Sequence, residues 1–317
     1  LSKEEAQLYD RQIRIWGFNA QQRIKSARVL LISVNPLSVE IAKNLVLVGV
    51  KSLIVMDDTL VTEQDIETIF CFQNEHKDLS SAEALLKYLH VLNGLVEVSC
   101  LKDFGSLEDA IGSVDLVCCT SFLSGKSELI SLDQKCRKQK VPLIISVTHS
   151  LAGVVFEDLG ETYEFSREHA DHKHNNLEVS ANFDSSKFEK ATASYDSLEF
   201  VNNAYYPNPM FKMDGISPLF TWFLRVINTM DDLFSWHSKE PKSGILRAHI
   251  CREAADSCNI SHIICDQLQI DGVISSIVGG IVSQEVIKVA SRMQQPINNF
   301  FAFDGSTSSG IAQLIRY

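Results

Sequence analysis

The first half of the chain alternates between two hydrophobic periods. Apolar runs of strand length lie at 28–34, 52–57, 95–101, 114–119 and 142–147. Apolar residues three or four positions apart, the spacing of an amphipathic helix, mark 38–48, 80–92 and 125–139. Because strands alternate with helices, the pattern predicts an α/β fold with a Rossmann-like, doubly wound, mostly parallel sheet and right-handed crossovers.

The two ends of the chain carry their own signals. Ser2 followed by Glu5 has the form of a capping box, which predicts a helix from residue 3 to about 16. Near the other end, apolar residues at helical spacing surround the pair Gly279-Gly280. The segments 298–305 and 310–317 then have the pattern of two closing strands.

The middle of the chain has a different character. Residues 160–210 have the composition of turns and loops, with little apolar periodicity. Helical patterns return at 217–236 and within 242–268. We therefore expect a core domain formed by 1–160 plus 270–317, interrupted by an inserted, partly helical region at 161–269.

Composition narrows the possible partners. The net charge of the 317 residues is -11, so we do not expect a phosphate-neutralising surface or a nucleic-acid partner. No apolar run approaches the roughly 20 residues that span a bilayer, so no membrane partner is expected. The charged N-terminal stretch lacks the apolar centre of a signal peptide, which predicts an intracellular location.

Two groups of residues raise the possibility of a metal site. Eight cysteines are present and none forms a C-x-x-C pair, so we expect reduced, mostly buried thiols. They are Cys71, Cys100, Cys118, Cys119, Cys136, Cys251, Cys258 and Cys265. The polar segment Glu168-His169-Ala170-Asp171-His172-Lys173-His174 has metal-binding composition, but its spacing fits many loop geometries. We expect no metal at either group.

The turn after the first predicted strand lacks the residues that a phosphate site needs. It reads Ser33-Val34-Asn35-Pro36-Leu37-Ser38 and contains no glycine. Proline removes one backbone N–H donor, and side chains fill the space in which backbone amides would surround an anion. The strand and helix of a dinucleotide-binding unit are thus present without its phosphate turn.

Several segments together resemble a known family. They are YDRQIRIWG (9–17), EIAKNLVLVGV (40–50), GGIVSQEVIKVA (279–290) and NNFFAFDG (298–305). In order and spacing they are similar to the adenylation fold of the activating enzymes for ubiquitin-like proteins, a superfamily that includes the bacterial MoeB and ThiF proteins. Within it, the chain most resembles the smaller, Aos-type subunits of the heterodimeric enzymes that activate SUMO. In those enzymes the smaller subunit does not bind ATP.

The resemblance explains the missing glycines, because the heterodimers of this family have two similar halves and only one of them binds ATP. The chain resembles the inactive half. An ATP-binding half of this family has a glycine-rich turn, an acidic residue for ribose, an Asn and Arg pair for the triphosphate, and an Asp for magnesium. Here only Asp57 is retained, since DIETIFCF (65–72) lacks the Asn and Arg, and Ser121 stands where the Asp is expected. The resemblance therefore implies no cofactor in this chain, with ATP, magnesium and zinc in the partner subunit.

One catalytic residue remains in this interpretation. In the family, the first arginine of the R-Q-I-R segment reaches the nucleotide bound in the other module, and the matching residue is Arg11. Its charge would stabilise the triphosphate during adenylation. The alternative is a surface arginine that pairs with Glu5 or Asp10. We expect Arg14 to pair with Asp10 and Trp16 to lie in the core.

The resemblance implies a function for the assembly. It would adenylate the SUMO C-terminus, pass it to a cysteine of the larger subunit and then to the SUMO-conjugating enzyme, in the nucleus and the cytoplasm. Three alternatives remain open at the level of sequence: a subunit that activates another ubiquitin-like protein, an atypical NAD-binding oxidoreductase, and an assembly protein without a catalytic group.

Overall fold

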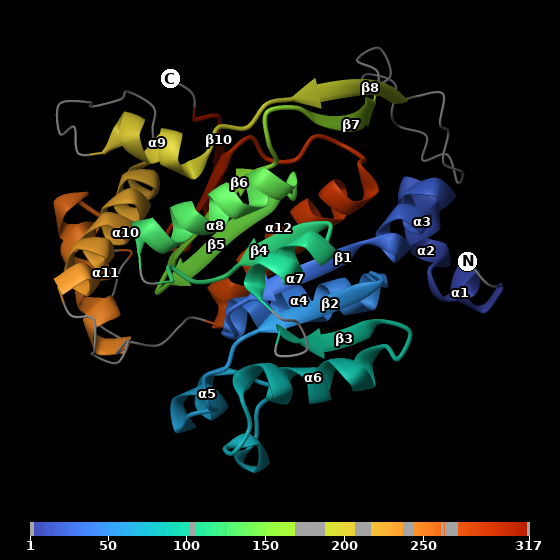
Figure 1. The fold of residues 1–317 in the computed structure, drawn as a ribbon, viewed down its shortest axis with the longest axis horizontal. Helices are drawn as coiled ribbons and strands as arrows, with labels where there is room; N and C mark the ends of the chain where they lie inside the picture. The colour runs from blue at the N-terminus through green and yellow to red at the C-terminus, as the bar shows by residue number, and fades with distance from the viewer. Residues whose placement is uncertain are drawn as a thin grey trace.

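A mixed eight-stranded sheet forms the centre of the molecule (Figure 1). The computed structural model describes residues 3–101, 106–123, 125–168, 188–206, 217–236, 244–260, 263 and 272–315. The strand order is β10-β9-β6-β5-β4-β1-β2-β3. Its parallel strands are β1 (Arg28–Ile32), β2 (Ser52–Met56), β3 (Glu97–Cys100), β4 (Leu116–Cys119) and β5 (Leu143–His149). All five fall within two residues of the predicted strands, and the doubly wound α/β class is confirmed.

The other edge of the sheet is antiparallel. It consists of β6 (Ala152–Asp158), β9 (Phe300–Asp304) and β10 (Ser309–Gln313). β5 turns directly into β6 through Ser150, whose φ of 54° lets the chain reverse between His149 and Ala152. β6 was not predicted, although every one of its residues is buried. The predicted closing pair of strands is present as β9 and β10.

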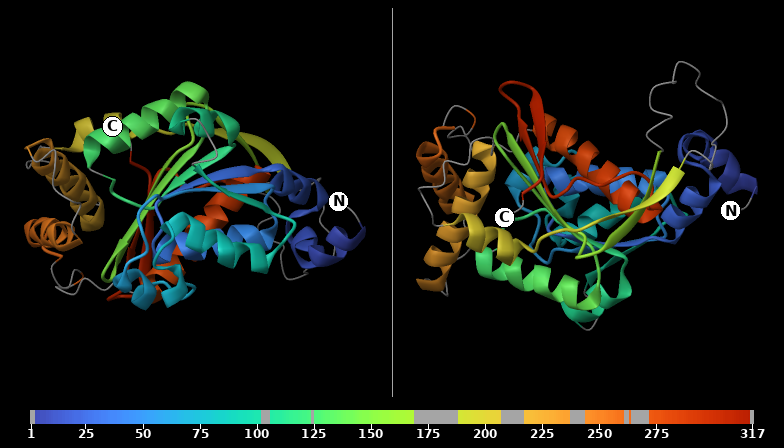
Figure 2. Two further views of the ribbon diagram at one scale, coloured as in Figure 1. Left: turned by 60° about the horizontal axis from the view of Figure 1, so that its bottom comes forward. Right: turned by 90° about the horizontal axis from the view of Figure 1, so that it is seen from above.

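Helices cover both faces of the sheet, as the edge-on views show (Figure 2). One face is covered by α3 (Phe18–Ser26), α4 (Pro36–Val48), α6 (Ser81–Leu92) and α12 (Gly272–Ser291). The other is covered by α7 (Leu107–Ser113), α8 (Lys126–Gln139), α10 (Pro218–Trp236) and α11 (Gly244–Ser257). Each layer buries its own apolar cluster against the sheet, which is the usual arrangement of a doubly wound fold. All predicted helices are found, but the N-terminal one is divided into two.

The predicted N-terminal helix is two helices. α1 (Lys3–Leu8) and α2 (Asp10–Trp16) are separated at Tyr9, whose side chain is 3% exposed. The break turns the Tyr9 ring inward, so tertiary packing overrides the continuous helical period. The capping residue Ser2 lies outside the described residues.

The expectation of turns and loops over 160–210 was partly wrong. β7 (Tyr163–Glu168) and β8 (Phe188–Ala193) form a separate antiparallel ribbon, and α9 (Leu198–Tyr205) follows. Along β7 only Tyr163 and Phe165 have buried apolar side chains, two positions apart. Two such residues among polar neighbours are too few to predict a strand from the sequence. The cluster His169 to His174 lies outside the described residues, and the division into a core and an inserted region stays a prediction.

α12 is apolar and long, and its packing explains its composition. Its 20 residues would suffice by length and hydropathy to cross a membrane. In the structure α12 packs against α4 and the sheet, and its buried residues include Val278, Val282 and Val286. It also carries Glu285, which pairs with Lys288 at 2.6 Å. α12 is therefore a core helix of this fold.

Candidate functional site

A pocket of about 920 Å³ lies at the carboxyl ends of the parallel strands. In open α/β sheets this edge is where ligands bind. The ends of β1, β2, β4 and β5 contribute to it, together with Ala248 and Cys251 of α11. The turn 33–35, Asp57 and Ser121 all line it. The structure therefore brings together the turn and Ser121, where the sequence predicted lost nucleotide contacts, with the retained Asp57.

The N-terminus of α4 is closed to an anion by its own cap. Asn35 Oδ1 accepts the backbone N–H of Ser38 (3.0 Å), and the Ser38 hydroxyl accepts the N–H of Asn35 (2.7 Å). Asn35 Nδ2 also donates to the Thr120 carbonyl at 2.7 Å, which fixes the turn to the end of β4. Pro36 has no N–H. Among the amides that could bind a phosphate at this helix N-terminus, that of Pro36 is thus missing and those of Asn35 and Ser38 are already bonded.

Asp57 is also engaged within the chain. Its carboxylate accepts the backbone N–H of Val34 at 2.7 Å, and from Thr59 it accepts both the N–H (3.0 Å) and the hydroxyl (2.6 Å). Asp57 does follow β2, as a ribose-binding acid would. Here it bonds the amide of the turn and its own loop, which gives it a structural role.

The charge of the pocket opposes a nucleotide. Its described lining residues include the four acids Asp57, Asp58, Asp65 and Glu83. No lysine or arginine is among the described residues that line it. Carboxylates close to a bound triphosphate would repel it, most strongly where solvent is partly excluded. Ser121, in place of a magnesium-binding acid, accepts the N–H of Leu123 at 3.0 Å. The described residues of this pocket do not fit ATP.

Arg11 lies on α2, away from this pocket. α2 and α3 precede β1, so they lie at the amino ends of the strands, opposite to the pocket (Figure 1). The two acids proposed as surface partners are engaged elsewhere: Asp10 pairs with Arg14 at 2.8 Å, and Glu5 contacts Lys25. The expected Arg14–Asp10 pair is confirmed. Arg11 is exposed and forms no ion pair within the described part of the chain.

The helix that carries Arg11 is anchored on both sides. Tyr9 packs on Gly49, the residue that ends α4, and its hydroxyl accepts from Asn93 Nδ2 at 3.1 Å. On the other side, Trp16 Nε1 donates to Gln21 Oε1 at 2.9 Å, and Gln21 Nε2 donates to the Val48 carbonyl at 3.1 Å. These contacts fix α2 on the C-terminal end of α4 and leave Arg11 facing outward.

Sequence reasoning missed most of these anchors. It placed Trp16 in the core, and the structure confirms that Trp16 packs, partly buried, against the core. The roles of Tyr9, Gln21 and Asn93 depend on contacts with α4 and could not be read from spacing. The only available signal was that Tyr9 opens the YDRQIRIWG segment.

The glycine pair of α12 has two different environments. A Cβ at Gly279 would lie 2.7 Å from Glu40 Cβ, so this glycine permits the close approach of α4. A Cβ at Gly280 would meet nothing within 4 Å. Val273 and Ile277 are 65% and 40% exposed on the same helix, two turns and one turn before Gly280 respectively. Gly279 serves packing, whereas Gly280 faces out beside an apolar surface.

The cysteines have the properties of buried structural residues. None of the seven described cysteines forms a disulfide, and five of them are buried. Burial raises the pKa of Cys71 and of Cys119 to about 12, and raises those of Cys118 and Cys136 further. A thiol must ionise to act as a nucleophile. None of these four is therefore suited to form a thioester.

We predict that this chain forms no thioester with a ubiquitin-like modifier, because burial keeps the thiols of Cys71, Cys118, Cys119 and Cys136 protonated. The measurement is non-reducing electrophoresis of a complete activation reaction, with the adduct assigned to a chain by mass spectrometry. The modifier should form no thioester with this chain. A reductant-sensitive adduct on this chain would contradict the prediction.

Comparison with known proteins identifies what this arrangement is similar to. The model of the ThiF family matches residues 9–315. SUMO-activating enzyme subunit 1 from Xenopus tropicalis is 29% identical, with 99% of this chain and 97% of that protein covered. The human protein of that name is 30% identical (99% and 96%), and that of Dictyostelium discoideum 28% (99% and 94%). Among solved structures, PaaA superposes with a TM-score of 0.60 at 14% identity, covering 100% of this chain and 84% of PaaA, which supports the fold.

Proposed function

This chain belongs to the ThiF family, and we propose that it is the smaller, non-nucleotide-binding subunit of a SUMO-activating enzyme. The observation that carries the proposal is the match to SUMO-activating enzyme subunit 1 along 99% of the chain. The larger subunit would bind ATP, magnesium and zinc and would supply the thioester-forming cysteine. The assembly would act in the nucleus and the cytoplasm.

The proposed reaction takes place on the partner. A carboxylate oxygen of the SUMO C-terminal glycine attacks the α-phosphorus of ATP, the α–β phosphoanhydride bond breaks and pyrophosphate leaves. The partner's thiolate then displaces AMP, which conserves the activation energy in a thioester. The part of this chain is to place Arg11, held outward on α2, against the triphosphate of the other subunit. Its position at the sheet edge opposite the chain's own pocket supports a role in trans.

We predict that the isolated chain does not bind Mg-ATP. The capped turn at Asn35, the engaged Asp57 carboxylate and the acidic lining of the pocket all oppose a triphosphate. Calorimetry on the folded chain should give no binding tighter than about 1 mM, a standard free energy of about -4 kcal/mol. Micromolar binding would overturn the assignment of an inactive half. NAD should likewise fail to bind, and tight NAD binding would favour the oxidoreductase alternative.

The surface of α12 around Gly280 fits the heterodimer interface in this proposal. Exposed Val273 and Ile277 supply apolar area, and a glycine beside them permits a close approach of the partner's backbone. Obligate interfaces are large and more hydrophobic than other surfaces. We infer that the subunits meet across this part of α12.

Replacing Gly280 with leucine should weaken the heterodimer without unfolding the chain. The site is open, and leucine is about 0.8 kcal/mol more favourable than glycine in a helix. The leucine side chain would nevertheless hold the partner away, and we expect a loss of affinity of about tenfold or more. The control is Lys87→Leu, an exposed position on α6. Equal affinities of both variants, measured by interferometry on the larger subunit, would rule out this interface.

A co-purification experiment tests the proposal in the native cell. The tagged chain is isolated at endogenous level, and its partners are identified by mass spectrometry. The proposal expects a stoichiometric larger subunit with the ATP-binding pattern and the catalytic cysteine. Recovery of an activating subunit for a different modifier would favour that alternative, and recovery of no activating subunit would reject the proposal.

A further inference from the structure

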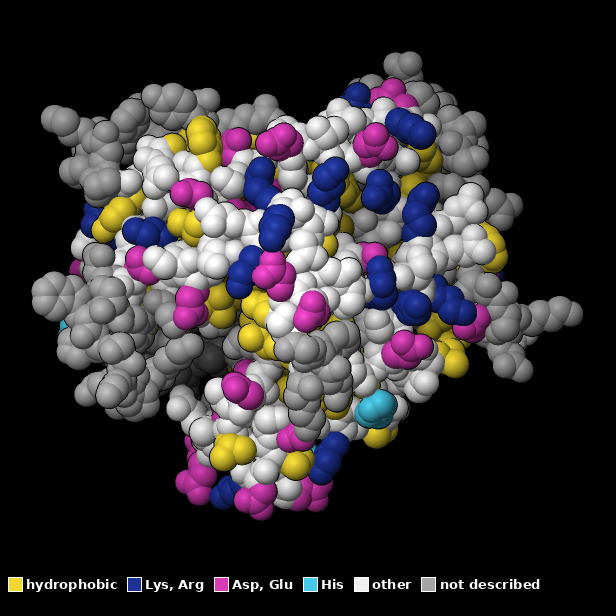
Figure 3. Space-filling model, in the orientation of Figure 1, with side chains coloured by type: hydrophobic (Ala, Val, Ile, Leu, Met, Phe, Trp, Pro, Cys, Tyr) yellow, Lys and Arg dark blue, Asp and Glu magenta, His cyan; other side chains and the backbone are white. Residues whose placement is uncertain are grey.

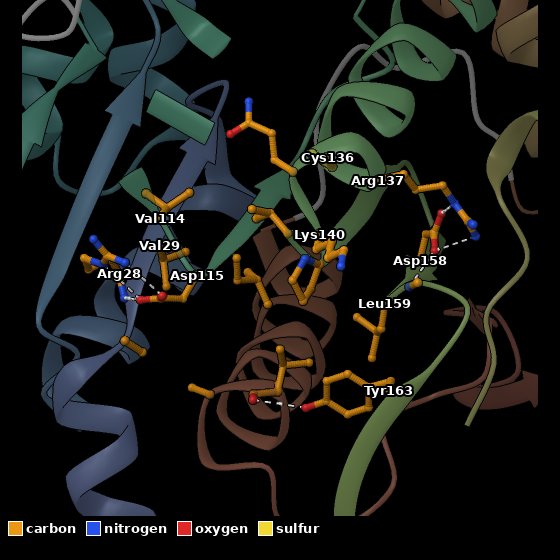
Figure 4. Close-up of a pocket in the computed structure, with 18 of the residues that line it drawn as sticks. Arg28, Val29, Val114, Asp115, Cys136, Arg137, Lys140, Asp158, Leu159 and Tyr163 are labelled. Carbon is orange, nitrogen blue, oxygen red and sulfur yellow. Dashed lines mark hydrogen bonds and ion pairs between the residues drawn. The ribbon is translucent and has the colours of Figure 1, made fainter. Parts of the chain in front are cut away.

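A second cavity, of about 1610 Å³, is shown in Figure 4. It lies at the opposite edge of the sheet from the pocket that contains Asp57 and Ser121, which we call the degenerate pocket. It is formed by the starts of β1, β4 and β5, by the segment from Asp158 to Glu164, and by the ends of α3, α8 and α12. Neither Arg11 nor any residue of the degenerate pocket lines it. The proposed function leaves this cavity unused.

Two arginines of the cavity are neutralised by carboxylates. Arg28 binds Asp115 through two side-chain bonds, of 3.1 and 3.0 Å. Arg137 binds Asp158 through bonds of 2.5 and 2.9 Å. Figure 4 shows these pairs on opposite sides of the cavity, with Lys140 between them. The pairs frame the cavity and contribute little net charge.

Four further cations lining the cavity have no such partner. Arg23, Lys51, Lys140 and Arg292 form no ion pair within the described ranges of the chain. Lys and Arg side chains gather on the face drawn in Figure 3, over the ends of α8 and α3. This concentration is unexpected in a chain whose net charge is -11. It produces a local positive potential on an acidic protein.

The fold compensates these charges only in part, since Lys51 lies close enough to Asp115 to lower the pKa of that carboxyl. Partial burial lowers the pKa of Arg23, and the nearby positive charge of Arg292 lowers it further. Burial raises the pKa of Asp133, which also lines the cavity, to about 8, and the neighbouring Asp158 acts in the same direction, so the negative charge of Asp133 is weakened. Glu161 and Glu164 are exposed to solvent. The cavity therefore holds like charges that an anion would stabilise.

Helix ends explain only part of this charge. The C-termini of α3, α4, α8 and α12 lie at this edge, and each attracts cations with a partial charge of about -0.5. Together they offset roughly two of the four unpaired cations. The remainder has no ion-pair partner among the described residues.

We propose that this cavity binds an extended acidic peptide segment of another protein. Lys51 precedes β2 and Lys140 precedes β5, with β1 and β4 between them. At about 4.8 Å per strand, this edge spans roughly 14 Å, the length of four or five residues of extended peptide. A single phosphate group is too small to contact cations spread over that distance. An extended run of Asp and Glu matches both the length and the charge.

The test measures the anisotropy of a fluorescent peptide of eight alternating Asp and Glu residues on the full chain, in the assembly in which it is purified. We compare Lys51→Gln/Lys140→Gln with a control that loses the same charge outside the cavity, Lys87→Gln/Lys135→Gln. The cavity variant should bind about tenfold more weakly. The control should match the parent chain, and binding should weaken as salt is raised.

Three outcomes would overturn the proposal. The peptide could fail to bind the parent chain at low salt. The two double variants could lose affinity equally, which would indicate attraction to total charge alone. Tripolyphosphate could bind the cavity residues more tightly than the peptide, which would make the site one for small phosphorylated ligands. A selective loss in the cavity variant, with weaker tripolyphosphate binding, would support it.

Discussion

Replacing Arg11 with alanine should slow SUMO-dependent ATP–pyrophosphate exchange by a factor on the order of 10² or more, the effect of removing a preorganised charge from a transition state. Heterodimer formation should be unaffected, because Arg11 is exposed and alanine is the best helix former. Lysine at this position should restore the rate only in part, since it lacks the planar fork that binds two phosphate oxygens.

Arg14→Ala is the matched control for this experiment. Arg14 lies one turn further along α2, is exposed and carries the same charge, but it pairs with Asp10. Its loss should change the exchange rate by less than about threefold, because exposed ion pairs contribute little. An Arg11→Ala heterodimer that assembles and exchanges pyrophosphate at the parental rate would show that this subunit acts only in assembly.

Replacing Gly49 with alanine should impair both stability and activity. Gly49 ends α4 with φ of 82°, and an added Cβ would lie 2.2 Å from the Tyr9 hydroxyl oxygen. Left-handed backbone strain and overpacking should together cost about 3 kcal/mol. The melting temperature should fall by about 5–10 °C in a calorimetric scan. Because Tyr9 anchors α2, the exchange rate should fall as well, through displacement of Arg11.

Gly94→Ala serves as the control, since a Cβ at Gly94 would meet nothing within 4 Å. It should leave both the melting temperature and the exchange rate near the parental values. If Gly49→Ala lowered stability while the exchange rate of the folded heterodimer stayed unchanged, the anchoring of α2 through Tyr9 would not be needed to position Arg11.

Local sequence patterns predicted the parallel half of the fold well, for a physical reason. β1 to β5 are buried between two helical layers, so each appears as a continuous apolar run, and α4, α6 and α8 bury one clear face. The break at Tyr9 could not be predicted in this way, because it depends on packing against Gly49, forty residues away in sequence. The ribbon β7–β8 was missed because only two inward residues mark β7.

The sequence predicted which nucleotide-binding residues the degenerate pocket lacks, but not the contacts that replace them. The missing glycines and the presence of Pro36 indicated that a phosphate would not bind. That Asn35 caps α4 and that Asp57 bonds the Val34 amide required three-dimensional contacts. The isolation of Arg11 was predictable only in part, since the Asp10–Arg14 pair was expected from its spacing but the contact of Glu5 with Lys25 was not.

ATP–pyrophosphate exchange in a reconstituted enzyme tests the central claim most directly. This chain, the larger subunit and SUMO are combined and then omitted one at a time, with ubiquitin replacing SUMO in a parallel reaction. We predict exchange only when both subunits and SUMO are present, and none from this chain with SUMO alone. Exchange at the full rate without this chain, or exchange by this chain in the absence of the larger subunit, would contradict its assignment as the inactive half of a SUMO-activating enzyme.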